Sequence, residues 1–194
     1  MTTELSPLKS SEQEFLQQTA RQRITTYDGN TWEYYDSGRM SDANAGRPPL
    51  VCLPGTSGVA RCFHLQLREL GAKGFRVLAV ESGLTKIALV LLCCPQLQLG
   101  TLSQQEIASR LTLNCLSCDP ESWKIFVPDE KITLIDSYED TSLPTALKDQ
   151  IGCRYPRTKQ ALIKNGGDFP FLSHHEEVTM YLQVHLRANG VFIA

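Results

Sequence analysis

Two short, almost wholly apolar segments separated by a helical pattern constrain the fold of this 194-residue chain more than any other feature. They are residues 50–53, Leu-Val-Cys-Leu, and residues 75–80. A strand that is apolar at nearly every position is typical of a parallel sheet covered on both faces. Between the two segments, apolar residues recur at helical spacing until two glycines end the pattern (Phe63, Leu67, Leu70, Gly71 and Gly74). The pattern predicts a βαβ unit in which residues 50–53 form a central strand.

An antiparallel hairpin is predicted before this unit. Residues 23–27 and 31–35 are rich in residues that favour strands, and Asp28-Gly29-Asn30 between them supplies the conformations of a tight turn.

The alternation of strands and helices continues in the second half. Strands are predicted at residues 87–94, 131–135 and 160–163. A helix beginning at Pro144 is expected to end at Gly152. Two capping boxes, Ser103 with Glu106 and Ser173 with Glu176, predict further helix starts. The last helix carries one apolar side (Val178, Tyr181, Leu182 and His185). The chain is therefore predicted to be one α/β domain over residues 1–194, with a mostly parallel sheet after the antiparallel hairpin.

The order of elements near the C-terminus bears on catalysis. An acidic loop at 136–140, a short strand, a Gly-Gly loop and a final helix follow the order in which an α/β-hydrolase presents its acid and its histidine. The nucleophile of that fold lies in a Gly-x-Ser-x-Gly turn, which this sequence lacks. The nearest segment is Val80-Glu81-Ser82-Gly83-Leu84, so Ser82 is expected to be an ordinary loop serine. Ser57 lies where such folds place the donors of an oxyanion hole, and a plain tight turn explains it equally well.

The histidine of a hydrolase is missing from its expected place. The segment Asn165-Gly166-Gly167-Asp168-Phe169 carries Asp168 where the base would be. A carboxylate is ionised at neutral pH and cannot relay a proton as imidazole does. The four histidines of the chain have simpler interpretations: His174 and His175 are expected to be solvated, and His64 and His185 to pack within helices. We expect no catalytic residue.

No metal or cofactor site is expected either. Cys115 and Cys118 form a Cys-x-x-Cys pair, but a structural zinc site requires four ligands and no second pair lies nearby. A redox role would require the pair to precede a helix, whereas it follows a predicted one. The neighbouring carboxylates Asp129-Glu130 and Glu139-Asp140 are expected to be solvated.

Composition restricts the compartment and the partners. Seven cysteines, an odd number, and the absence of an Asn-x-Ser/Thr acceptor favour a reducing, cytosolic environment. Glu4, Glu12 and Glu14 near the start are unlike a signal peptide, and the longest apolar run, residues 87–94, is too short to span a bilayer. The formal net charge of −2 argues against nucleic acid as a partner.

Three segments resemble the maspardin family of the α/β-hydrolase superfamily. They are Ser109-Arg110-Leu111-Thr112-Leu113-Asn114-Cys115, Ile132-Thr133-Leu134-Ile135-Asp136 and Asn165-Gly166-Gly167-Asp168-Phe169-Pro170-Phe171-Leu172. The resemblance runs from about residue 103 to 186, with a looser likeness at 50–54 and 74–80.

The resemblance implies a three-layer α/β-hydrolase-like sandwich that has lost catalysis and serves as a binding or adaptor protein. It implies protein partners, namely the cytoplasmic tail of the T-cell coreceptor and an aldehyde dehydrogenase. It also implies a role as a negative regulator of T-cell activation and a cytosolic location with peripheral association to endosomal and trans-Golgi membranes. Glu139 falls where the superfamily places its acid.

This sequence departs from the family between residues 83 and 101. The elbow strand, its serine-bearing turn and the helical lid are missing there, about a hundred residues in all, the size of a small domain. The chain is therefore interpreted as an internally shortened form, and the strand at 50–53 is expected to have an uncovered apolar edge. Two alternatives stay open: a weak serine esterase using Ser82 or Ser57 with Glu139 or Asp136 as acid, and a poorly folding splice fragment.

Overall fold

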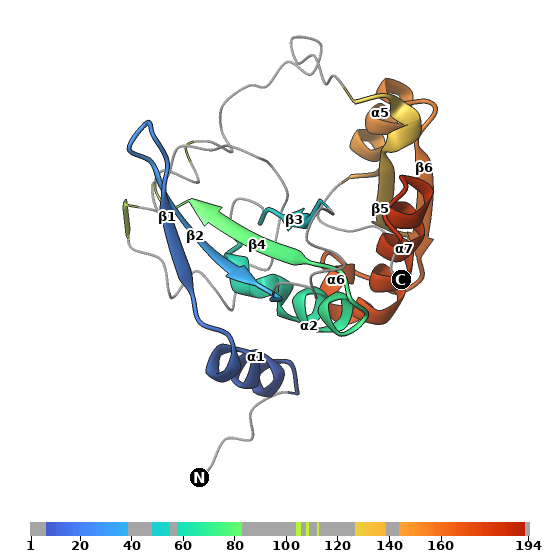
Figure 1. Cartoon of the computed structure of the whole chain (residues 1–194). Helices are drawn as coiled ribbons and strands as arrows, with labels where there is room; N and C mark the ends of the chain where they lie inside the picture. The colour runs from blue at the N-terminus through green and yellow to red at the C-terminus, as the bar shows by residue number, and fades with distance from the viewer. Residues whose placement is uncertain are drawn as a thin grey trace. The chain divides into compact units, whose positions relative to one another are not determined.

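The computed structural model describes residues 7–38, 48–54, 58–82, 127–138 and 144–192, with helical positions 104–105, 108 and 112 between them. These residues fall into two compact units, one from α1 to β4 and the other from η5 to α7, and each has its own sheet (Figure 1). The predicted α/β class is confirmed. The single domain over residues 1–194 stays a prediction. The predicted strand at 87–94, the junction at 83–101 and the Ser103–Glu106 capping box lie outside the described residues, as do Ser57, Cys115, Cys118, Glu139 and Asp140.

The first unit has a four-stranded mixed sheet in the order β1-β2-β4-β3. Its elements are α1 (Pro7–Gln18), β1 (Gln22–Thr25), β2 (Thr31–Asp36), β3 (Leu50–Cys52), the 3-10 helix η2 (Ala60–Phe63), α2 (His64–Ala72) and β4 (Val77–Ser82). β2 runs antiparallel to β1 and to β4, whereas β3 and β4 are parallel. The sheet is therefore mixed, where the sequence predicted a mostly parallel one.

The predicted hairpin is confirmed. β1 and β2 pair from Gln22 with Tyr34 to Thr25 with Thr31. The turn closes because the Thr26 backbone N–H donates to the Asn30 carbonyl at 2.8 Å and Gly29 adopts a φ of +78°. A side chain is rarely tolerated at such a φ, which explains the glycine.

The first βαβ unit is also confirmed, but the place of β3 is not central. Among the described strands, β3 pairs with β4 alone and forms an edge of the sheet. Val51 is 49% exposed and Leu53 is 44% exposed. An apolar run thus identified the strand, while its uncovered edge agrees with the expectation drawn from the missing segment.

One face of this sheet packs against the helices. Tyr35 of β2 and Val77 and Ala79 of β4 are buried, and Leu67 and Leu70 of α2 are almost completely buried. The sequence did not predict α1, whose side chains are mostly polar. Phe15 is its buried residue, and the Phe15 ring packs edge-on against Tyr35 with centroids 5.4 Å apart.

The second unit contains a two-stranded parallel sheet between helices (Figure 1). Its elements are the 3-10 helix η5 (Asp129–Lys131), β5 (Thr133–Ser137), α5 (Thr145–Arg154), β6 (Lys159–Ile163), α6 (Pro170–Ser173) and α7 (His175–Ala188). Thr133 of β5 contacts α7 through His185, whereas Asp136 contacts α5 through Lys148. Residues an odd number of positions apart on a strand face opposite sides, so α5 and α7 cover opposite faces.

Two details of the predicted helices are wrong. α5 does not end at Gly152 but continues to Arg154. The residue before a proline is forced out of helical conformation, and Tyr155, which precedes Pro156, has φ −124° and ψ 70°. Ser173 does not cap α7, because its hydroxyl donates instead to the Gly166 carbonyl at 2.6 Å.

Candidate functional site

The carboxyl ends of β5 and β6 bring the two loops of interest to one edge. Because the strands are parallel, Ser137 stands opposite Ile163, and the Tyr138 N–H donates to the Ile163 carbonyl at 3.0 Å. The loop after β6 then folds back over the strand ends. A Cβ added at Gly166 would lie 3.1 Å from Ser137 Oγ and 3.2 Å from Ile163 Cγ2. Glycine is therefore required for this close approach.

Asp136 is held by a lysine at this edge. Lys148 Nζ of α5 lies 3.2 Å from Asp136 Oδ1 and donates to the Ser137 carbonyl at 3.1 Å. Asp136 Oδ1 also accepts the Ser137 N–H at 2.7 Å. The Lys148 ammonium thus links α5 to the end of β5, and the Asp136 carboxylate has a counter-charge rather than an imidazole at this position.

Asp168 lies on the exposed surface of the other loop, directly after Gly167, which has a φ of +62°. This is the place that the sequence reasoning gave to the base of a hydrolase. The described edge therefore presents two carboxylates, Asp136 and Asp168, together with the Lys148 ammonium.

The nearest serine and histidine to this loop have the wrong polarity for catalysis. The Ser173 hydroxyl donates to the Gly166 carbonyl at 2.6 Å and is 3.2 Å from the Phe169 carbonyl. His174 Nδ1 lies 3.1 Å from Ser173 Oγ. Because the hydroxyl proton points to a carbonyl, the imidazole can only donate to this oxygen. A general base has to accept the proton of its serine instead.

The other histidines lie elsewhere in their units. His185 Nδ1 is 2.8 Å from Thr133 Oγ1, at the first residue of β5 and so at the opposite end of that strand. Burial, followed by the positive charge of Lys159, lowers the pKa of His185 from its ordinary value of 6.5. His64 is buried in the first unit, where its Nδ1 lies 3.1 Å from the Arg61 carbonyl. His175 begins α7. The predicted packing roles of His64 and His185 are confirmed.

Two acids and an arginine form a polar cluster in the first unit. Arg21 pairs with both Glu33 and Glu81, and the Glu81 carboxylate accepts the Ala60 N–H at 2.7 Å. Ala60 begins η2, directly before α2, on the connection from β3 where Ser57 was expected to mark oxyanion donors. An anionic side chain of the protein is therefore already bound at this N–H. The sequence reasoning missed this role of Glu81.

Ser82 is the last residue of β4 and stands opposite Trp32 of β2. It is part of a strand rather than of a loop, which corrects the sequence prediction. The first unit thus places Ser82 in a paired strand.

The cysteine and metal predictions are only partly within view. Burial raises the pKa of the Cys52 thiol to about 12, so this residue is not a ready nucleophile. Within residues 7–38, 48–54, 58–82, 127–138 and 144–192, no three His, Cys, Asp or Glu side chains gather as metal ligands. In the same part of the chain, no helix combines the length and the apolar character needed to cross a membrane.

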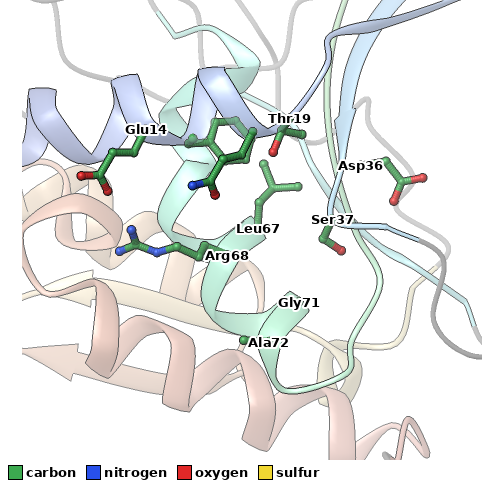
Figure 2. Close-up of a pocket in the computed structure, with 10 residues that line it drawn as sticks. Glu14, Thr19, Asp36, Ser37, Leu67, Arg68, Gly71 and Ala72 are labelled. Atoms are coloured by element: carbon green, nitrogen blue, oxygen red, sulfur yellow. The ribbon is translucent and has the colours of Figure 1, made fainter.

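A cavity of about 160 Å³ lies between α1, the end of β2 and α2 in the first unit (Figure 2). Gly71 on its wall approaches β2 so closely that an added Cβ would lie 3.0 Å from Ser37 Cβ. Glu14 of α1 and Arg68 of α2 lie at this cavity (Figure 2). A cleft for a cofactor-sized ligand has a volume of about 300 Å³ or more. We therefore assign no ligand to this cavity.

Comparison with known proteins agrees with the resemblance seen in the sequence. The chain is 40% identical over 90 residues to maspardin of Danio rerio, and 40% identical over 89 residues to maspardin of Homo sapiens and of Mus musculus. Each match covers 46% of this chain but 28% of the length of the relative. No family model matches the chain. The chain is thus a maspardin-like protein over somewhat less than half of its length.

Proposed function

We propose that this chain is a non-catalytic binding or adaptor protein built on an α/β-hydrolase-type scaffold. The observation that carries the proposal is the edge formed by the ends of β5 and β6. Asp136 is paired with Lys148 there, and Asp168 occupies the loop that would carry the catalytic histidine. The neighbouring His174 donates a hydrogen bond to Ser173 instead of accepting its proton. This edge can bind charged or polar groups but lacks a proton relay.

The first unit supports the same proposal independently. Acyl transfer needs free backbone donors that stabilise a developing oxyanion. The N–H of Ala60 instead binds the Glu81 carboxylate at 2.7 Å. An ester oxygen approaching this position would have to displace an anion that is also paired with Arg21.

The scaffold belongs to the proposal as well. Two βαβ units, β3-α2-β4 and β5-α5-β6, have parallel strand pairs, and α5 and α7 cover opposite faces of the second sheet. These features and the likeness to maspardin support a three-layer sandwich of the α/β-hydrolase type, shortened by loss of the elbow strand and lid. Because each match covers 28% of the relative, function is proposed for the shortened chain alone.

The partners follow from the resemblance. We propose that the chain binds the cytoplasmic tail of the T-cell coreceptor and an aldehyde dehydrogenase, as a negative regulator of T-cell activation. The proposed location is the cytosol, with peripheral association to endosomal and trans-Golgi membranes. No nucleic acid is proposed as a partner, because the net charge is −2.

A fluorophosphonate probe tests the catalytic part. The folded chain should incorporate no more probe than the Ser82→Ala variant, with an active serine hydrolase as positive control. Labelling that disappears in Ser82→Ala would contradict the proposal and favour the weak esterase.

Binding is tested with an immobilised peptide of the coreceptor tail and with purified aldehyde dehydrogenase. Saturable binding of the folded chain, absent with a scrambled peptide, is expected. Hydrogen exchange on the same sample provides the control for folding, since a stable domain protects its central strands. Rapid exchange in β4 and β5 would favour the poorly folding fragment instead.

A further inference from the structure

Two Asn-Gly dipeptides occur in the chain, at residues 165–166 and 189–190. Asparagine followed by glycine is the sequence most prone to deamidation, because glycine has no side chain to hinder attack by its own backbone nitrogen. The two sites share this sequence but differ in hydrogen bonding. The difference allows the structure to rank them.

The first dipeptide lies in the loop that covers the ends of β5 and β6. Asn165 is exposed and adopts a φ of +55°, in the left-handed region. Among the hydrogen bonds of the described residues, the Gly166 N–H has no acceptor, whereas its carbonyl accepts from Ser173. The attacking nitrogen is therefore not held by a hydrogen bond that its deprotonation would break.

The second dipeptide ends α7 and is fixed on both sides. The Gly190 N–H donates to the Arg187 carbonyl at 3.0 Å, and Asn189 Nδ2 donates to the His185 carbonyl at 2.9 Å. Attack at this site must break the first bond to free the nucleophile and the second to rotate the side chain. Each break adds to the activation free energy.

We propose that Asn165 is a site of spontaneous deamidation in the folded protein. Hydroxide removes the Gly166 N–H proton, and the nitrogen forms a bond to Cγ of Asn165. The bond from Cγ to Nδ2 breaks, and the amide leaves as ammonia after taking up a proton from water. One water molecule then opens the cyclic imide at either carbonyl and yields an aspartyl or isoaspartyl residue.

The product changes the proposed binding edge. A new carboxylate appears three residues before Asp168, on the edge that already contains Asp136, and the formal net charge becomes more negative by one. The isoaspartyl form also inserts a methylene into the backbone directly before Gly166, which is packed against Ser137 Oγ. Deamidation would thus irreversibly alter the charge and the shape of this surface.

The test compares both sites in the full-length chain at 37 °C in mildly alkaline buffer. Cleavage by trypsin after Lys164 and Arg187 places the two asparagines in separate peptides for mass spectrometry. A parallel sample in concentrated urea reports the rates that the sequence alone sets. An isoaspartyl methyltransferase with labelled methyl donor identifies the isoaspartyl product, and Asn165→Gln serves as the variant without the first site.

In native buffer, Asn165 should deamidate about tenfold faster than Asn189, because two hydrogen bonds protect the second site. In urea the two rates should be nearly equal. The Asn165→Gln variant should lose most of the methyl labelling of the native chain. Equal native rates at both sites, or a faster rate at Asn189, would overturn the inference.

Discussion

Gly166 shows how a single missing side chain shapes the candidate site. Its place between Ser137 Oγ, Ile163 Cγ2 and Pro170 Cβ leaves no room for a methyl group. The sequence marked this loop by its two glycines. It did not indicate that Gly166 is the one packed against β5, because that contact joins residues far apart in the chain.

We expect Gly166→Ala to destabilise the protein by about 1–3 kcal/mol, the usual cost of overpacking. The measurement is the free energy of unfolding in urea. Gly152→Ala is the matched control, because its Cβ would meet Gln160 Nε2 only at 3.8 Å. Alanine at this helical position should be neutral or stabilising by up to about 1 kcal/mol. Equal effects of both substitutions would refute the close approach at Gly166.

His185 is expected to make stability depend on pH. Burial and Lys159 lower the pKa of His185 in the folded chain below its ordinary value of 6.5. The unfolded chain then binds the proton more tightly, so the free energy of unfolding should decrease as the pH falls through 6.5 toward the folded pKa.

The His185→Gln variant should therefore lose less stability than the unmodified chain between neutral pH and about pH 5. Chemical denaturation at a series of pH values measures this slope. His174→Gln controls for the general effect of losing a histidine. A slope that stays the same in His185→Gln would show that other groups cause the acid sensitivity.

At the scale of elements, α1 has the weakest signal in the sequence and a single apolar anchor in the structure. Its polar residues gave no periodic apolar face, so sequence reasoning overlooked it. Phe15 packs on Tyr35 and lies 6.2 Å from His64, between ring centroids. Glu12 adds an ion pair to Arg61 at 2.8 Å.

Phe15→Ala should therefore cost about 3 kcal/mol and speed amide exchange throughout α1. Hydrogen exchange with mass spectrometry measures the protection of residues 7–18. Leu16→Ala is the matched control, since Leu16 is 39% exposed and its truncation should cost less than about 1 kcal/mol. Unchanged protection of α1 in Phe15→Ala would contradict the anchoring role.

The regular elements were predictable to the extent that short-range rules determine them. The Asp28-Gly29-Asn30 turn and both βαβ units follow from turn chemistry and apolar runs. The edge position of β3, the extension of α5 past Gly152 and the hydroxyl bond of Ser173 to Gly166 depend on neighbours outside each segment. The candidate site was located from the order of its loops, whereas the roles of Lys148 and Glu81 required the structure.

At the scale of the whole molecule, exposed sheet edges matter most. A two-stranded sheet is only marginally stable by itself, and β5 and β6 depend on the helices that cover them. β3 in the first unit has Val51 and nearby Leu53 exposed at the edge of its sheet. An exposed apolar edge strand promotes pairing between molecules.

Val51→Lys should reduce self-association, because a charged edge opposes pairing with a second strand. Its free energy of unfolding should stay within about 0.5 kcal/mol, as expected for an exposed position. Light scattering at increasing protein concentration measures the effect. Ile24→Lys, at the opposite edge in β1, should change scattering less because Arg23 already charges that edge. A larger effect of Ile24→Lys would place the sticky edge at β1.

The cluster around Glu81 sets a limit on how far the chain can be trimmed. Glu81 is only 10% exposed at its side chain, and Arg21, one residue ahead of the first strand, is one of its charged partners. A nearly hidden acid that loses its counter-ion is strongly destabilising. A shorter expression product should therefore begin ahead of Arg21, even though the sheet itself starts at Gln22.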